Sequence, residues 1–267
     1  MNFLRSLCCA GLTIAASAIT PAQVKMSELP GLAYEQNFDR LPAPTEQSPW
    51  EWTNDGRQTR YDLAGWYIFS LATSGKPLTG PTAYLSAGGK LPTAVATVNF
   101  GLPGDADRAI GFRFSAKGET NAKQHFFAGV VFVNDTKQPI ARVSITYTGE
   151  QWSKFGGNAE TSQTLRVVMA NLGAKFAPEK FAAHTVKPVA EIASLEFASV
   201  DDATGATTYA KKGPLHTARR TAMIGFPRAL APGEHLLVLW TATGNGTDTG
   251  AHSLAVDDVR VQLVPAS

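Results

Sequence analysis

Leu254-Ala255-Val256-Asp257-Asp258-Val259-Arg260-Val261-Gln262-Leu263 is the stretch of this chain that decides its fold. Apolar residues alternate along it as they do on a half-buried β-strand, but the alternation changes phase between Val256 and Val259. A shift of one residue moves the apolar side chains of a strand to the opposite face of its sheet. A β-bulge at Asp257-Asp258 would bring both halves back to one face, because it adds one residue to the strand. The stretch therefore predicts a long strand with a bulge at its two aspartates.

The rest of the chain also reads as strands. Runs of strand-like residues separated by Gly, Pro, Asn and Asp dominate the sequence after residue 30, and sustained helical periodicity is nearly absent. Ile110–Phe114 and Val143–Tyr147 have apolar residues at every second position, which predicts one covered and one wet face. Phe126–Val133 and Leu236–Trp240 are apolar on both faces and are predicted to lie centrally. The predicted fold class is all-β, a single antiparallel β-sandwich of jelly-roll type.

Turn chemistry predicts how some of these strands connect. Proline followed by glycine in Ala231-Pro232-Gly233-Glu234 is typical of a sharp reversal, which predicts a hairpin between Thr221–Phe226 and His235–Thr243. Pro178–His184 can form a single helical turn, since proline suits a first helical position. One domain, residues 31–267, is large enough to bury its own core.

The N-terminus has the pattern of a secretory signal. Residues 1–18 contain Arg5, an apolar run and the small residues Ala16-Ser17-Ala18, as in an A-x-A cleavage site. The apolar run is too short to span a membrane, so we expect no transmembrane segment in the mature chain. Cleavage after Ala18 would remove Cys8 and Cys9, the only two cysteines. Residues 19–30 are predicted to be a flexible segment.

The charge of the mature chain excludes some classes of partner. Without residues 1–18, 23 basic side chains face 22 acidic ones. A net charge of about +1 gives no reason to expect nucleic acid or an anionic membrane. The pairs Lys211-Lys212 and Arg219-Arg220 do not change this, and we interpret them as solvated charges of loops or edge strands.

Several segments carry a resemblance to a known family. Val143–Trp152 resembles the "SYTGEQW" signature of exported bacterial β-sandwich proteins that often carry a PEP-CTERM sorting signal. Tyr34–Asp39 is similar to the opening of that family, Asp107–Gly111 to its middle, and Leu254–Asp258 after Trp240 to its end. The resemblance implies an exported protein, secreted or at the cell surface. The chain stops at Ser267, before the family's VPEP motif and transmembrane tail, so we expect it to be released or held by other means.

A looser similarity connects the same two ends to jelly-roll carbohydrate-binding modules and MAM domains, folds of the concanavalin or galactose-binding type. Where such modules bind a structural calcium, carboxylates of the first and last strands supply oxygen ligands, which calcium requires. The resemblance therefore implies Asp39 and Asp257 as metal ligands, with Glu35 as a weaker third. The alternative is that Asp39 begins a turn and Asp257 marks a solvent-facing bulge.

Four residues are candidates for contact with a saccharide. Glu150 and Trp152 follow a strand, as a glycosidase acid beside a sugar-stacking indole would, but the sequence supplies no second carboxylate. The alternative is that Trp152 packs at a sheet edge while Glu150 accepts hydrogen bonds. Trp50 and Trp52 share one face of an extended segment, which suits either a sugar platform or a cover over the core.

No other motif points to chemistry. The five histidines are isolated, without the spacing of a zinc site, and Tyr84 stands where a nucleophile elbow needs glycine. The sequence therefore predicts an exported, non-catalytic β-sandwich that binds a polysaccharide or a cell-surface component. A secreted hydrolase acting on carbohydrate and a purely structural or adhesive matrix protein are the alternatives.

Overall fold

The computed structural model describes most of the chain after residue 22. The described residues are 23–41, 61, 63–71, 77–79, 83–84, 96–101, 106–113, 125–154, 163–181, 186, 190–200, 208–209, 213–243 and 252–266. Trp50 and Trp52 lie outside them, as do residues 1–22, which include the predicted signal. None of the helices in the described ranges has the length and apolar character needed to cross a membrane.

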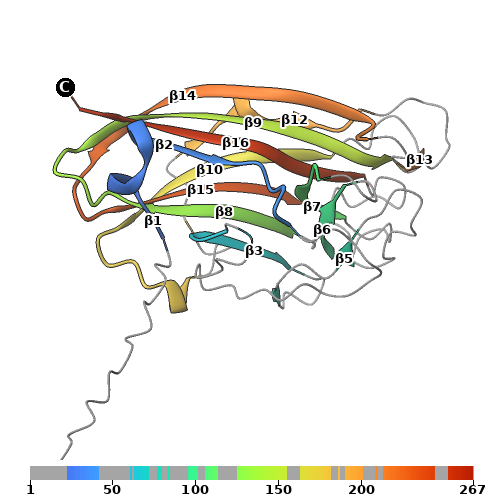
Figure 1. Cartoon of the computed structure of the whole chain (residues 1–267), viewed down its shortest axis with the longest axis horizontal. Coiled ribbons are helices and arrows are strands. Elements are labelled where there is room, and N and C mark those ends of the chain that lie inside the picture. Colours follow the sequence, from blue (N-terminus) through green and yellow to red (C-terminus); the bar gives the residue numbers. More distant parts are fainter. Residues whose placement is uncertain are drawn as a thin grey trace, which may run out of the picture.

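The described strands form two sheets that face each other (Figure 1). Sheet A contains, in spatial order, β11 (Ala190–Glu191), β10 (Thr164–Gly173), β15 (His235–Thr243), β8 (His125–Val133), β3 (Trp66–Leu71) and β4 (Pro77–Thr79), with β1 (Val24–Lys25) beside β8 and β12 (Phe197–Ala198) beside β10. Sheet B contains β13 (Thr208–Tyr209), β9 (Ile140–Lys154), β16 (Ser253–Pro265), β7 (Ala109–Arg113), β6 (Ala96–Phe100) and β5 (Ala83–Tyr84), with β14 (His216–Leu230) beside β9 and β2 (Ala33–Gln36) beside β16.

The chain alternates between the two sheets. From β8 it crosses to β9 in sheet B, then to β10 in sheet A, and later from β14 in sheet B through β15 in sheet A to β16 in sheet B. Almost all neighbouring strands are antiparallel; β1 with β8 and β5 with β6 are the parallel pairs among the described residues. This alternation makes the fold a jelly-roll β-sandwich, which confirms the predicted fold class.

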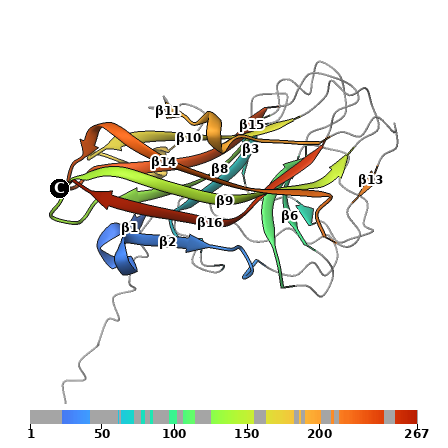
Figure 2. The ribbon, with the colours of Figure 1, turned by 90° about the horizontal axis from the view of Figure 1, so that it is seen from above.

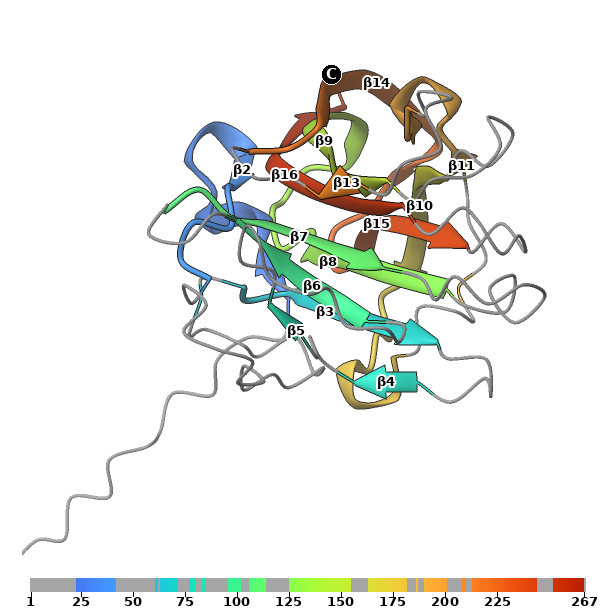
Figure 3. The ribbon, with the colours of Figure 1, turned by 90° about the vertical axis from the view of Figure 1, so that its right-hand side faces the viewer.

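The main core lies between the sheets (Figure 3). Trp66 of β3 and Trp240 of β15 stack with ring centroids 5.7 Å apart, and Tyr147 of β9 meets Trp240 edge-on. Trp66 Nε1 donates to the hydroxyl of Tyr34 at 2.6 Å, which satisfies a polar atom inside the core. The predicted central position of β8 and β15 is confirmed, since each pairs with strands on both sides.

The predicted bulge is present in β16. The register of β16 against β9 shifts between Asp257 and Arg260, and Asp258 has a φ of 47°. Aspartate tolerates this left-handed conformation better than most residues. The side chains of the two halves consequently join the same core cluster, namely Leu254, Val256, Val259, Val261 and Leu263.

The predicted hairpin between β14 and β15 is wrong. Glu234 N donates to Ala231 O and Gly233 has a φ of 83°, as in a type II turn, but β14 pairs with β9 whereas β15 pairs with β8 and β10. The turn therefore forms an arch from one sheet to the other. A proline-glycine turn reverses the chain without deciding in which sheet the next strand lies.

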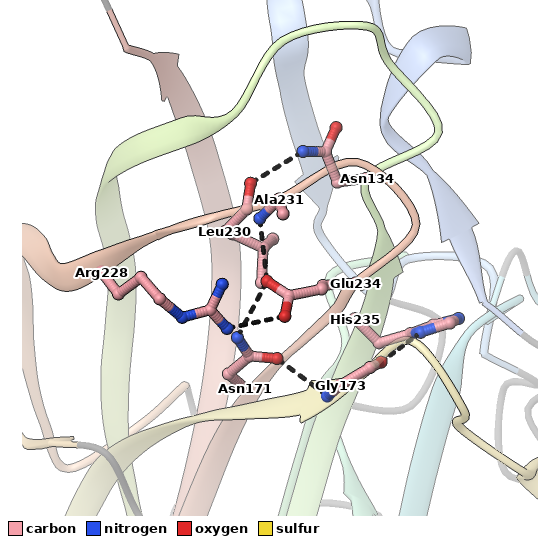
Figure 4. Close-up of polar contacts among 8 residues, drawn as sticks. All are labelled: Asn134, Asn171, Gly173, Arg228, Leu230, Ala231, Glu234 and His235. Carbon is pink, nitrogen blue, oxygen red and sulfur yellow. Dashed lines mark hydrogen bonds and ion pairs between the residues drawn. The ribbon is translucent and has the colours of Figure 1, made fainter.

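Polar contacts hold this arch against the turn that follows β8 (Figure 4). The side chain of Asn134 donates to Leu230 O at 2.9 Å, as Figure 4 shows, and also to Gln138 O at 3.0 Å. Glu234 accepts hydrogen bonds from Arg228, from the backbone N–H of Ala231 and from Asn171. We call the Asn134 side-chain contacts with Leu230 and Gln138 the Asn134 clamp.

Short 3₁₀ turns complete the described structure: η1 (Met26–Glu28), η2 (Pro30–Leu32), η3 (Pro178–Lys180) and η5 (Ala193–Leu195). η3 lies where a helical turn is predicted. The described part of the predicted flexible segment, residues 23–30, differs from that prediction, since β1 pairs with β8 and Met26 is fully buried. Burial of Met26 offsets the entropy lost when a short terminal segment becomes ordered.

Candidate functional site

The outer face of sheet B gathers most of the predicted site residues. Tyr147 of β9 points into the core, so Thr148, Glu150 and Trp152, at alternate positions, lie on the other face. In the register of β9 and β16, Thr148 is opposite Asp257 and Glu150 is opposite Ala255. Residues opposite each other share a face, so Glu150 and Asp257 are diagonal neighbours on this outer face. Sequence reasoning found both residues but not that they are neighbours.

Glu150 and Trp152 are bonded to each other and almost completely buried. Trp152 Nε1 donates to Glu150 Oε2 at 2.7 Å. The exposed fraction is 5% for Glu150 and 4% for Trp152, and the indole ring stacks on Phe100 of β6 with centroids 5.6 Å apart. A sugar therefore has no access to the ring face that Phe100 covers.

Carboxyl groups crowd around the bulge. Burial, with Asp107 and Asp258 nearby, raises the pKa of Glu150 to about 7, although the bond from Trp152 opposes the shift. Burial and the charge of Glu150 raise the pKa of Asp257 to about 9, while the bond from the backbone N–H of Asp258 opposes it. Both side chains therefore carry a proton in weakly acidic solution.

The other predicted metal ligand, Asp39, follows β2 on the side of the bulge in β16. β2 runs antiparallel to β16 with Gln36 opposite Val259, so the residues after Gln36 continue along the bulge. The Asp39 carboxylate accepts hydrogen bonds from Asn37 Nδ2 at 2.5 Å and from Arg108 N at 3.3 Å. No group of three or more His, Cys, Asp or Glu side chains in the described ranges is arranged to hold a metal ion. Calcium at Asp39 and Asp257 stays a prediction.

A groove lies at the bulge, lined by residues from β2, β14 and β16, and we call it the trough. It has a volume of about 540 Å³ and is lined by Glu35, Gln36, Asn37, Arg219, Asp258, Val259 and Arg260. Figure 2 shows the strands involved, β14, β9, β16 and β2, side by side in that order. Residues adjacent to these in sequence, such as Tyr34, Phe38 and Val261, point into the core, so the exposed lining side chains stand on the outer face.

The polar lining of the trough is only partly paired. Arg260 Nη1 donates to Glu35 Oε1 at 2.5 Å, and Thr148 Oγ1 donates to Asp258 Oδ2 at 3.3 Å. Sequence reasoning missed the trough, because it treated Arg219 as a solvated edge charge. The alternation of exposed and covered residues along β14 places Arg219 on the outer face. That Arg219 lies near the bulge depends on the pairing of β14 with β9 and of β9 with β16, for which the sequence has no signal.

Comparisons with known proteins identify no family. No protein-family model matches the chain, and no curated protein matches it. The enzymatically active domain of bacteriophage CBA120 tailspike protein 4 is similar over 79% of this chain, with 9% identity and a TM-score of 0.35; the chain spans 21% of that protein's length.

Two carbohydrate-binding modules are also similar. The CBM22-1 xylan-binding domain of Paenibacillus barcinonensis Xyn10C has 9% identity and a TM-score of 0.30, covering 75% of this chain and 96% of that domain. TmCBM27, a module described for mannan recognition, has 10% identity and a TM-score of 0.31, covering 88% of this chain and 96% of the module. At such low similarity, function has to be sought in the residues of this chain.

Proposed function

We propose that this protein is an exported, non-catalytic β-sandwich that binds a polysaccharide in the trough. The observation that carries the proposal is the lining of the trough, which combines carboxylates, amides and guanidinium groups on one exposed face. Its volume of about 540 Å³ lies within the range of roughly 300–1,000 Å³ common for ligand sites.

The chemistry of the lining suits a ligand rich in hydroxyl groups. A sugar hydroxyl both donates and accepts hydrogen bonds, so it needs acceptors and donors close together. Asp258 and Glu35 supply carboxylate acceptors, Arg219 and Arg260 supply donors, and Asn37 supplies both.

Burial favours binding over catalysis at the carboxyl pair. Glu150 and Asp257 are 5% and 4% exposed, and neither lines the trough. A general acid or base must come within hydrogen-bond distance of its substrate. In the proposal these carboxyl groups support the floor of the site.

Binding to a panel of soluble polysaccharides tests the proposal, with affinity electrophoresis followed by titration calorimetry. We expect at least one polysaccharide to bind the wild type and to bind Asn37→Ala about tenfold more weakly, as for a lost hydrogen-bonding side chain. Met223→Ala is the matched control, because Met223 is exposed on β14 outside the trough. If no polysaccharide binds, the structural or adhesive alternative takes its place.

Hydrolysis of a glycan is a second candidate, favoured by the proximity of two carboxyl groups with raised pKa values. One group would act as a general acid and the other as a base or nucleophile. The test is release of reducing sugar from each polysaccharide that binds. Turnover that disappears in Glu150→Gln while binding persists would support an enzyme, whereas binding without turnover supports the module.

Export by residues 1–18 and a calcium ion at Asp39 and Asp257 belong to the same proposal. Support for the calcium comes from the crowding of Asp257 by Glu150, Asp258 and Asp107, since a divalent cation would offset the repulsion among these carboxylates. Asp39 and Asp257 would hold the ion through their oxygen atoms. Support for export comes from the signal pattern of the sequence.

A further inference from the structure

Arg219 differs from the other charged residues of the trough. Arg260 is bonded to Glu35, and Asp258 accepts a hydrogen bond from Thr148. The side chain of Arg219 makes no hydrogen bond and no ion pair with any residue in the described ranges. The trough therefore contains one guanidinium group whose donors are available to a ligand.

The position of Arg219 directs that group toward the ligand site. Arg219 is opposite Thr148 in the pairing of β14 with β9, and Thr148 is opposite Asp257 in the pairing of β9 with β16. These three residues form a row across the sheet at the bulge. Because Arg219 is exposed and lines the trough, its guanidinium stands at the β14 end of the site.

The carboxyl groups around Arg219 repel an anion only weakly. Glu35 is paired with Arg260, and Glu150 and Asp257 are buried and do not line the trough. Asp258 is the carboxylate of the trough lining that has no cationic partner among the described residues, and its Oδ2 accepts a hydrogen bond from Thr148. An anion beside Arg219 consequently meets less repulsion than the number of acidic residues suggests.

We propose that the trough selects an acidic saccharide, and that Arg219 binds the carboxylate of a uronic acid unit through two parallel N–H···O hydrogen bonds. Guanidinium and carboxylate match in this bidentate geometry, and such charge-assisted bonds are stronger than bonds to neutral hydroxyl groups. The inference rests on the proposed function and adds to it the class of saccharide and the residue that selects it.

The test compares polygalacturonate with its fully methyl-esterified form, two polymers with the same backbone that differ in carboxylate charge. Titration calorimetry at weakly acidic pH measures binding to the wild type, Arg219→Gln and the control Met223→Ala. We expect the wild type and the control to bind the acid about tenfold more tightly than the ester, and Arg219→Gln to bind both alike. Added salt should weaken only the acid-specific part.

The outcomes separate this inference from the proposed function. Equal binding of acid and ester by the wild type, or binding of neutral polysaccharides alone, overturns the selection of an acidic saccharide but leaves saccharide binding in place. Binding of no polysaccharide overturns both. Preference for the acid that persists in Arg219→Gln overturns the role of Arg219. Because Arg219 is exposed, we expect the variant to keep the wild-type denaturation midpoint, which is measured first.

Discussion

Asn134 is fully buried, yet each polar atom of its amide has a partner. Asn134→Ala would leave the carbonyl oxygens of Leu230 and Gln138 without these donors. We therefore expect the free energy of unfolding to fall by about 2–4 kcal/mol, as for other broken buried networks. Urea denaturation measures the loss. Asn171→Ala, which removes a single 3.2 Å bond to Glu234 and one bond from Gly173, is the control, and an equal loss in both variants would contradict a special role for the Asn134 clamp.

Glu150 makes the stability depend on pH. Its pKa rises from 4.5 to about 7 on folding, so the folded state holds the proton more tightly than the unfolded state. The stabilisation is complete below pH 4.5 and is lost as the pH rises toward 7, at roughly 1.4 kcal/mol per pH unit for one group. We expect Glu150→Gln to lose less stability than the wild type over this interval, as measured by urea denaturation. Glu191→Gln, at an exposed carboxylate, should follow the wild type; a parallel fall in Glu150→Gln would contradict the assignment.

Individual residues could be predicted better than their partners. Glu150, Trp152 and Asp257 stand out in the sequence because polar or aromatic residues follow or interrupt strand patterns. The diagonal contact of Glu150 with Asp257 depends on the register of β9 and β16, which are separated by about a hundred residues of chain. The place of Arg219 in the trough has no local signal in the sequence, since it depends on the pairing of β14 with β9.

At the scale of elements, the bulge in β16 keeps the strand in phase with the core. Deletion of Asp258 would turn Val259, Val261 and Leu263 toward solvent, or force β16 out of register with β9 and β2. Each apolar side chain moved out of the core costs about 1.5–3 kcal/mol. The sum approaches the whole stability of a typical domain, so we expect the deletion variant not to fold.

Circular dichroism and a cooperative urea transition check the deletion. Asp258→Gly is the control, because glycine accepts the φ of 47° at that position without strain and keeps the residue count. We expect Asp258→Gly to fold with stability close to that of the wild type. A cooperative transition in the deletion variant at the wild-type midpoint would show that the strand does not need the extra residue.

The sequence of a strand shows which of its residues face the core, but it does not show which other strands pair with it. The pattern of residues 254–263 specified the bulge because both apolar halves must reach one core. The Pro232-Gly233 turn specified a reversal but not the arch, which depends on contacts of Asn134 with Leu230 and Glu234 from distant parts of the chain. Such a turn can lead to a hairpin within one sheet or to an arch between two sheets, and the predicted hairpin is wrong.

At the scale of the whole molecule, the N-terminal strand β2 and the last strand β16 lie side by side. β2 pairs with β16 in sheet B. Asp39 follows the paired residues of β2, and Asp257 precedes those of β16. The all-β class was predictable because apolar alternation fixes the faces of strands. The order of strands in each sheet was not, since it is set by contacts across the sandwich.

Calcium should raise the unfolding temperature of the mature protein if Asp39 and Asp257 hold an ion that the unfolded chain cannot bind. We expect the transition in excess calcium to lie above that in chelator, and the difference to vanish in Asp257→Ala and in Asp39→Ala. Glu191→Ala, at an exposed site in sheet A, should keep the full difference. Binding must displace the proton of Asp257, whose pKa is raised to about 9, so the calcium effect should grow as the pH rises. Equal transitions in calcium and chelator at every pH would remove the metal from the proposal, and Asp257 would remain a buried support of the bulge.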